Sequence, residues 1–123
     1  MSDSTLRERS KSFAKEIVFL CRDLKSKGVE RDLVNQLLRC GTSIGANIHE
    51  GQYGQGIADF ISKFEIALKE CHETEYWLEL IFEVGGMEEA TFKGIKNECG
   101  AIRRMLISSC KTMKERKANI SKA

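Results

Sequence analysis

The sequence predicts an all-α protein, folded as an antiparallel up-down-up-down four-helix bundle, and three observations support this class. Proline is absent from the 123 residues, so no residue of that kind interrupts a helix. Apolar residues recur every three or four positions along the chain, as they do on one face of an α-helix. Glycines gather near positions 28, 51–56 and 85–86 and divide the chain into long amphipathic stretches. Short connections between such helices favour antiparallel neighbours.

The first two expected helices are each defined by one apolar stripe. The first covers about residues 4–27, and its stripe contains Leu6, Phe13, Ile17, Leu20 and Leu24. Gly28 follows it and suits the left-handed position that ends many helices. The second covers about residues 30–50, and its stripe contains Leu33, Leu37, Cys40, Ile44 and Ile48.

The last two expected helices are separated by Gly85 and Gly86. The third, about residues 57–84, has the most regular stripe, with steps of four and three: Phe60, Phe64, Ala67, Cys71, Thr74, Leu78 and Ile81. The fourth begins with Glu88 and Glu89, whose charges suit the positive end of a helix dipole. Its stripe contains Phe92, Ile95, Cys99, Ile102, Leu106 and Met113. Beyond about residue 117 we expect the chain to fray.

The length and charge of the chain limit its possible functions. Residues 1–123 fit a single domain, and 20 Lys and Arg against 18 Asp and Glu give a net charge of +2. A nucleic-acid role would therefore depend on local basic patches. The first residues, MSDSTLRERSKSFAKE, lack the apolar stretch of a secretory signal, and no early apolar run is long enough to span a bilayer. We expect a cytoplasmic protein that does not bind membranes.

Several apolar residues lie off the main stripes: Val18, Val34, Leu38, Ile61, Leu68, Trp77 and Phe82. One bundle core is not expected to bury all of them. Large contiguous apolar patches are unusual on soluble monomers, so the surplus predicts that copies of the chain associate.

The glycine-rich run GTSIGANIHEGQYGQG at residues 41–56 does not match a phosphate-binding loop. It lacks the G-x-x-x-x-G-K-[ST] spacing and the strand that precedes such a loop. Gly41, Gly45 and Ala46 are instead expected on a helix face where a neighbouring backbone approaches closely. We assign Gly51, Gly54 and Gly56 to a loop.

The sequence predicts neither a metal centre nor a cofactor site. Di-iron bundles use Glu-x-x-His motifs, but the residues three positions before His49 and His72 are alanine and lysine. The run Glu70, Cys71, His72, Glu73 cannot converge on one ion, because neighbours in sequence point to different sides of a helix. The five cysteines contain no CxxC spacing and are expected as free thiols that serve as small buried apolar residues.

A polar row is the main candidate for a site within the bundle. Steps of four and three place four polar side chains together on the second helix: Arg39, Ser43, Asn47 and Glu50. On the third helix, Glu70, Glu73 or Lys69 are possible partners. A network including Glu73 would fix the register of the two helices. The alternative is a small-ligand binder or an enzyme that uses this polar cluster in a cleft between the helices.

Charge is distributed unevenly between the last two helices. Residues 57–84 contain seven acids and two bases, whereas residues 103–123 contain seven bases and one acid. A basic strip at one end of the molecule is a candidate surface for RNA or DNA: Arg103, Arg104, Lys111, Lys114, Arg116 and Lys117. The alternative is that these bases pair with the acidic third helix, with cations also favoured near a helix C-terminus.

Two stretches, QLLRCGTSIGANIHEGQYGQ and DFISKFEIALKECHETEYWLELI, closely resemble the family called four-helix bundle protein. Its members include proteins encoded by intervening sequences within large-subunit ribosomal RNA genes. The family pattern is carried by Gln36, Arg39, Ser43, Ile44, Asn47, Ile48, Glu50, Phe60, Phe64, Ile66, Ala67, Glu73, Tyr76, Trp77 and Leu78. Cys40, His49 and Cys71 depart from it, which argues against a chemical role for them.

The resemblance implies a ring-like homopentamer with no established enzymatic activity. The accessory subunit of diversity-generating retroelements is similar in fold, and that relative binds nucleic acid and a reverse transcriptase through a basic surface. Our leading hypothesis is therefore a non-catalytic, cytoplasmic oligomer without a cofactor that binds RNA or DNA through basic residues. A protein partner that docks on Tyr53 or Trp77 is a further possibility.

Overall fold

The computed structural model describes residues 3–122, which form four α-helices. These are α1 (Asp3–Ser26), α2 (Arg31–Gln52), α3 (Ile57–Glu83) and α4 (Glu89–Lys122). The predicted all-α class is confirmed, and the predicted helix bounds differ from the observed ones by one or two residues, except at the end of α4. No helix among the described residues is long and apolar enough to cross a membrane.

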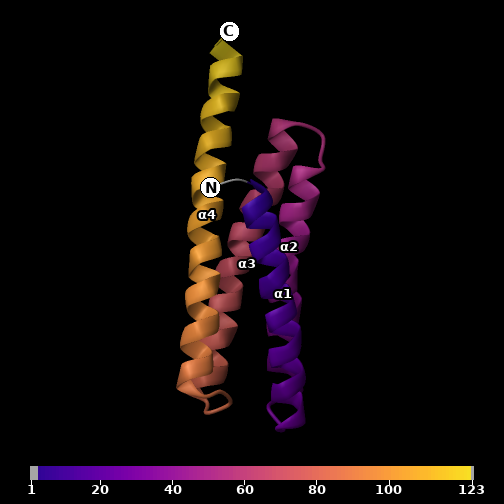
Figure 1. The fold of residues 1–123 in the computed structure, drawn as a ribbon, viewed down its shortest axis with the longest axis vertical. Helices are drawn as coiled ribbons and strands as arrows, with labels where there is room; N and C mark the ends of the chain where they lie inside the picture. Colours follow the sequence, from indigo (N-terminus) through magenta and orange to yellow (C-terminus); the bar gives the residue numbers. More distant parts are fainter. Residues whose placement is uncertain (1–2, 123) are drawn as a thin grey trace.

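The four helices surround one core. Helix α1 packs against α2, α2 against α3, α3 against α4, and α4 against α1. Figure 1 shows that the chain reverses direction at each short connection. Most of the predicted stripe residues are buried, including Phe13, Ile44, Phe64, Leu78 and Ile102. A smaller set of stripe residues is only partly buried and packs on the edge of the core: Leu33, Phe92, Ile95 and Met113.

The surplus of apolar residues is smaller than predicted. Val34 is fully buried in the core, and Ile61 is also buried, because each lies on the edge of its helix that faces a neighbour. Leu38, Leu68 and Trp77 are partly buried against the same core. The large apolar side chains that are exposed are all different ones: Phe19, Tyr53, Ile66, Tyr76, Val84, Ile107 and Ile120.

Two helices end in the same hydrogen-bonded cap. Gly28 has φ +84°, and the amides of Gly28 and Val29 donate to the carbonyls of Lys25 and Leu24. This pattern is the Schellman motif, in which a left-handed residue lets the chain satisfy the last carbonyls of a helix. Gly85, with φ +83°, ends α3 in the same way, and the predicted role of Gly28 is confirmed.

The glycines of α2 allow a close approach to α1. A Cβ atom on Gly41 would lie 2.9 Å from Cγ2 of Ile17, and one on Gly45 would lie 3.3 Å from the carbonyl oxygen of Ser10. The predicted close approach of a neighbouring backbone is confirmed at Gly45, whereas Gly41 makes room for the side chain of Ile17. Ala46, however, is exposed, because it lies one residue beyond the face that meets α1.

Gly51 was expected in a loop, and this is wrong. It lies in the last turn of α2, is buried, and faces α3, where a Cβ atom would lie 2.9 Å from the Phe64 ring. Gly54 and Gly56 do lie in the connection between α2 and α3.

Helix α4 is longer than the bundle that it packs against. It continues to Lys122, so the prediction that the chain frays beyond residue 117 is wrong. Figure 1 shows its C-terminal part projecting past the other three helices. Residues 114–122 are all exposed. Residues 111–122 at the end of α4 are therefore a helical arm, in which only Met113 packs against the core.

Candidate functional site

The predicted polar row is only partly joined to α3. Nη2 of Arg39 lies 2.6 Å from Oε2 of Glu73, and Nη1 lies 3.4 Å from Oε2 of Glu70. Nε of Arg39 also donates to the side-chain oxygen of Gln36 on the preceding turn. Arg39 thus links α2 to α3, as the register-fixing interpretation predicts.

The other members of the row are not part of this network. The hydroxyl of Ser43 donates to the carbonyl of Arg39, and the amide of Asn47 donates to the carbonyl of Ser43. Glu50 forms an ion pair with Lys63, at an Nζ to Oε2 distance of 3.5 Å. Side-chain bonds to a carbonyl one turn earlier are common for such residues in helices. Of the five predicted residues, Arg39 and Glu73 form one link between α2 and α3, and Glu50 forms a second link with Lys63. Ser43 and Asn47 form only local bonds within α2.

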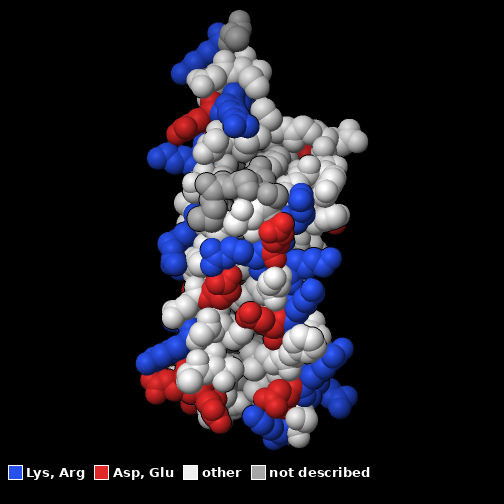
Figure 2. All heavy atoms as spheres, viewed as in Figure 1, with Lys and Arg blue, Asp and Glu red and all other residues white. Residues whose placement is uncertain are grey.

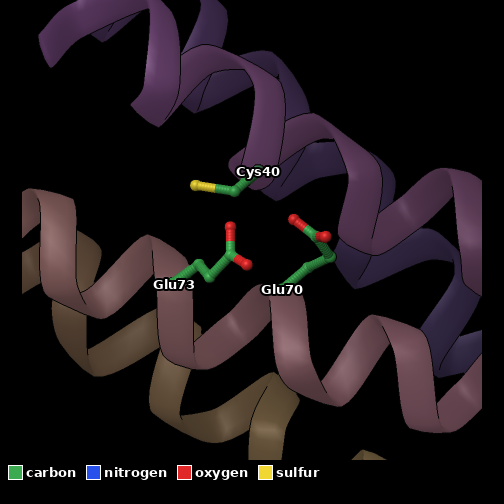
Figure 3. Close-up of side chains that lie close together, drawn as sticks. All are labelled: Cys40, Glu70 and Glu73. Carbon is green, nitrogen blue, oxygen red and sulfur yellow. The ribbon is translucent and has the colours of Figure 1, made fainter.

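Cys40 joins the two glutamates in a way that the sequence did not indicate. Its sulfur atom and carboxylate oxygens of Glu70 and Glu73 lie within 4.8 Å of one another. Figure 3 shows the three side chains in the space between α2 and α3. The spacing of Glu70 and Glu73, one turn apart, was visible in the sequence. The approach of Cys40 was not, because it depends on how α2 and α3 pack.

This cluster fits an ion pair better than a metal ion. A metal requires a thiolate, but burial raises the pKa of the Cys40 thiol. Both carboxylates already interact with the Arg39 guanidinium. The run Glu70, Cys71, His72, Glu73 diverges as expected: Cys71 is buried whereas His72 is exposed.

The environment of Glu70 is unfavourable for its charge. Its pKa is raised, first because burial disfavours the carboxylate and second because the charge of Glu73 is close. Arg39 partly opposes both effects. The pKa of Arg39 is itself raised, mainly by the hydrogen bond to Glu73.

All five cysteines are free and buried, as predicted. The thiol of Cys99 donates to the carbonyl of Cys71, and the pKa of Cys99 is raised by the neighbouring Cys71 side chain and by burial. Burial raises the pKa of Cys21 to about 11. Thiols in this state are poor nucleophiles, which supports a packing role.

The predicted basic strip is divided among three sides of α4. Nε of Arg103 lies 2.8 Å from Oε1 of Glu75, and Nζ of Lys114 lies 3.6 Å from Oε2 of Glu65, so both bases pair with α3. Arg104 instead lines a groove between α4 and α1. The pairing alternative therefore accounts for two of the six predicted residues.

The three remaining bases, Lys111, Arg116 and Lys117, are exposed. Within the described residues, none of them has a carboxylate partner. Arg116 contacts only the sulfur of Met113 on its own helix. Figure 2 shows basic side chains along the projecting end of α4. These three bases lie on the projecting arm of α4, where Lys114 between them is paired with Glu65.

Two grooves beside α4 were not predicted. One lies between α1 and α4, has a volume of about 360 Å³ and contains Arg9, Arg104, Ser108 and Ser109 among its lining residues. The other lies between α3 and α4, has a volume of about 510 Å³ and is mainly apolar. Its apolar lining includes Leu68, Ile107, Cys110 and Ala118. Side-chain spacing alone does not reveal how far apart two neighbouring helices lie.

Of the predicted docking residues, Tyr53 is exposed and lies near the guanidinium of Arg7. Trp77 is partly buried against the core, and its ring meets Tyr76 edge to face. Tyr76, which is exposed, is therefore the more available aromatic side chain on α3.

Comparison with known proteins agrees with this fold. The family model described as 23S rRNA-intervening sequence protein matches residues 2–108. A crystal structure of a protein with unknown function from the S23 ribosomal protein family of Bacteroides thetaiotaomicron is 43% identical, with a TM-score of 0.88. That match covers 90% of this chain and 99% of the other. None of the curated proteins matches. The chain therefore belongs to the 23S rRNA-intervening sequence protein family.

Proposed function

We propose that this protein is a non-catalytic helical bundle that assembles with copies of itself and binds RNA through the projecting end of α4. The observation that carries the proposal is the arm itself: residues 111–122 are helical, and all of them except Met113 are exposed. A helix end gains little stability when it has almost no tertiary packing. A partner that contacts the arm would explain why a long helix is maintained there.

The charge of the arm favours an anionic partner. Residues 111–122 contain five bases, Lys111, Lys114, Arg116, Lys117 and Lys122, and the single acid Glu115. Among the described residues of the arm, only Lys114 is paired with a carboxylate of the bundle. Phosphate contacts by such residues supply most of the affinity in non-specific nucleic-acid binding.

Self-association is the second part of the proposal. Ile107 and Ile120 are exposed on α4, at 46% and 64%, and Ile107 borders the apolar groove between α3 and α4. The family resemblance favours a homopentamer. A ring of copies would bring several arms together and strengthen their field at an RNA strand.

We propose no catalytic role for the polar cluster between α2 and α3. Arg39 interacts with two carboxylates, and Ser43 and Asn47 donate to carbonyls of their own helix. A ligand in this place would have to replace those bonds. The arrangement supports a structural link between helices better than it supports a binding cleft or an enzyme.

The RNA proposal is tested by reversing charge on the arm. We expect the triple variant Lys111→Glu, Arg116→Glu, Lys117→Glu to bind structured RNA much more weakly than the wild type. The dependence of log Kd on log salt should decrease by roughly 0.7–0.9 for each phosphate that the variant no longer neutralises. Binding is measured by fluorescence anisotropy across a series of salt concentrations.

A matched control distinguishes an effect of the bases on the arm from an effect of the net charge of the protein. The variant Lys15→Glu, Lys25→Glu, Arg31→Glu changes three exposed bases elsewhere and alters the net charge equally. We expect it to retain most of the affinity. An equal loss in both variants, or no binding of RNA by the wild type at low salt, would contradict the proposal.

A further inference from the structure

The groove between α1 and α4 has the dimensions and lining of a small-ligand site. Its volume of about 360 Å³ falls within the range of roughly 300–1,000 Å³ that is typical of such sites. Leu6 and Met105 line the bottom of the groove, but they are only 1% and 8% exposed, so they present a narrow apolar strip. Arg104, Ser108 and Ser109 form a polar wall on α4. The groove therefore combines an apolar surface with hydrogen-bond donors.

The polar groups of this wall are not used within the described part of the chain. Arg104 forms no ion pair there, and the hydroxyls of Ser108 and Ser109 form no hydrogen bond. By contrast, Ser43 and Thr74 each donate to a carbonyl one turn earlier. Residues four apart lie on one helix face, so Arg104 and Ser108 can act on the same ligand group.

The opposite side of the groove is held in place by Arg9. Its Nη2 and Nε donate to the two carboxylate oxygens of Glu98 at 2.8 and 3.1 Å, and Nη1 contacts the sulfur of Met105 at 3.7 Å. Glu98 compensates the charge of Arg9 and fixes its position. Arg104 is therefore the cation of the groove that has no counter-ion in the described chain.

The ligand that matches this lining carries one anionic group with several acceptor atoms and one flat apolar part. A phosphate accepts hydrogen bonds from a guanidinium and from hydroxyls at the same time, and charge-assisted bonds of this kind are strong. The narrow apolar strip suits the edge of a ring, because methionine makes favourable contacts with ring edges.

We infer that the groove between α1 and α4 binds a nucleoside phosphate, with the phosphate at Arg104, Ser108 and Ser109 and the edge of the base at Met105. A free mononucleotide and one nucleotide of an RNA strand present the same chemistry. The inference does not rest on the proposed function, because the groove uses none of the exposed bases of the α4 arm: Lys111, Arg116 and Lys117.

Isothermal titration calorimetry with adenosine 5′-monophosphate, adenosine and a short oligoadenylate tests the site. We expect saturable binding of one monophosphate per chain and much weaker binding of adenosine, which lacks the phosphate. Arg104→Gln should weaken binding by about tenfold or more, since it removes a charged hydrogen-bond donor. Arg116→Gln removes one exposed arginine of the same helix outside the groove and should leave the affinity unchanged.

Two further measurements identify the source of the phosphate and guard against a variant that does not fold. If only the oligoadenylate binds and Arg104→Gln weakens it, the inference holds and the ligand is a strand. If Arg104→Gln fails to fold by circular dichroism, Ser108→Ala decides, with a loss of several-fold expected.

Three outcomes overturn the inference. The first is no saturable binding of either phosphorylated compound. The second is an affinity that neither Arg104→Gln nor Ser108→Ala alters. The third is an equal loss in Arg116→Gln. The variant reversed at Lys111, Arg116 and Lys117 must keep its affinity for the monophosphate, so failure of RNA binding by the arm is distinguishable from failure of the groove.

Discussion

At the scale of single residues, the link between α2 and α3 depends on Arg39. Its guanidinium lies between two carboxylates one turn apart, and the nearer contact, to Glu73, is partly exposed. Exposed ion pairs of this kind contribute roughly 0–1 kcal/mol each. They contribute mainly to geometry, because an arginine that contacts two acids one turn apart fixes the axial register of α2 and α3.

Glu70 is expected to make stability depend on pH. Because burial raises its pKa above the ordinary value of 4.5, the folded protein binds the Glu70 proton more tightly than the unfolded chain does. The free energy of unfolding contributed by this group therefore decreases as pH rises from 4.5 through the raised pKa. Glu70→Gln removes that loss, so the variant should gain stability relative to the wild type as pH rises from 4 to 7.

Urea unfolding at several pH values measures this effect. Glu73→Gln is the control, because it removes the negative charge from the shorter contact with Arg39 and should weaken the fold slightly at neutral pH. A Glu70→Gln variant whose advantage decreases with rising pH would show that the carboxylate is favourably solvated in the folded protein.

At the scale of helices, the contact between α1 and α2 depends on small residues at defined positions. Gly41 and Gly45 face Ile17 and Ser10 closely, whereas Gly94 on α4 has open space around it. Glycine within a helix costs roughly 0.5–1 kcal/mol relative to alanine. That cost is offset where the missing side chain permits close packing, and it is not offset at Gly94.

Two alanine substitutions should therefore have opposite effects. Gly94→Ala is expected to stabilise the protein by about 0.5–1 kcal/mol, because it improves helix propensity without a clash. Gly41→Ala is expected to destabilise it by about 1–3 kcal/mol, because its Cβ atom would overlap the branched side chain of Ile17. Chemical denaturation of both variants provides the comparison. If both variants are more stable than the wild type, α1 and α2 can move apart at Gly41 without a loss in the free energy of unfolding.

The helices were predictable because their signals are local. Apolar stripes and the glycine at position 28 determine where the first helix ends, and both are visible in the sequence. The packing role of Gly51 was not visible in the sequence, because the end of α2 and the loop that follows it have a similar composition. The approach of Cys40 to Glu70 and the widths of the grooves beside α4 depend on packing between helices, which local spacing does not specify.

At the scale of the whole molecule, α4 has two kinds of surface. Its N-terminal part packs against α3 and α1, while its C-terminal arm projects beyond the bundle (Figure 1). Between them, Ile107 and the apolar groove against α3 remain exposed, with Lys111, Lys114 and Glu115 at the rim. An apolar centre with a charged rim is the usual anatomy of a protein interface. We therefore expect copies of the chain to meet at this groove.

Self-association at the groove predicts a specific effect of Ile107→Asp. A charge in the centre of an apolar interface would be desolvated without a partner, so this variant should shift the protein toward the monomer. Val84→Asp places the same charge at an exposed valine outside the groove and should leave the assembly intact. Light scattering on a sizing column at micromolar concentration gives the mass of each species. A monomeric wild type would disprove self-association, whereas dissociation caused equally by both variants would place the interface elsewhere on the molecule.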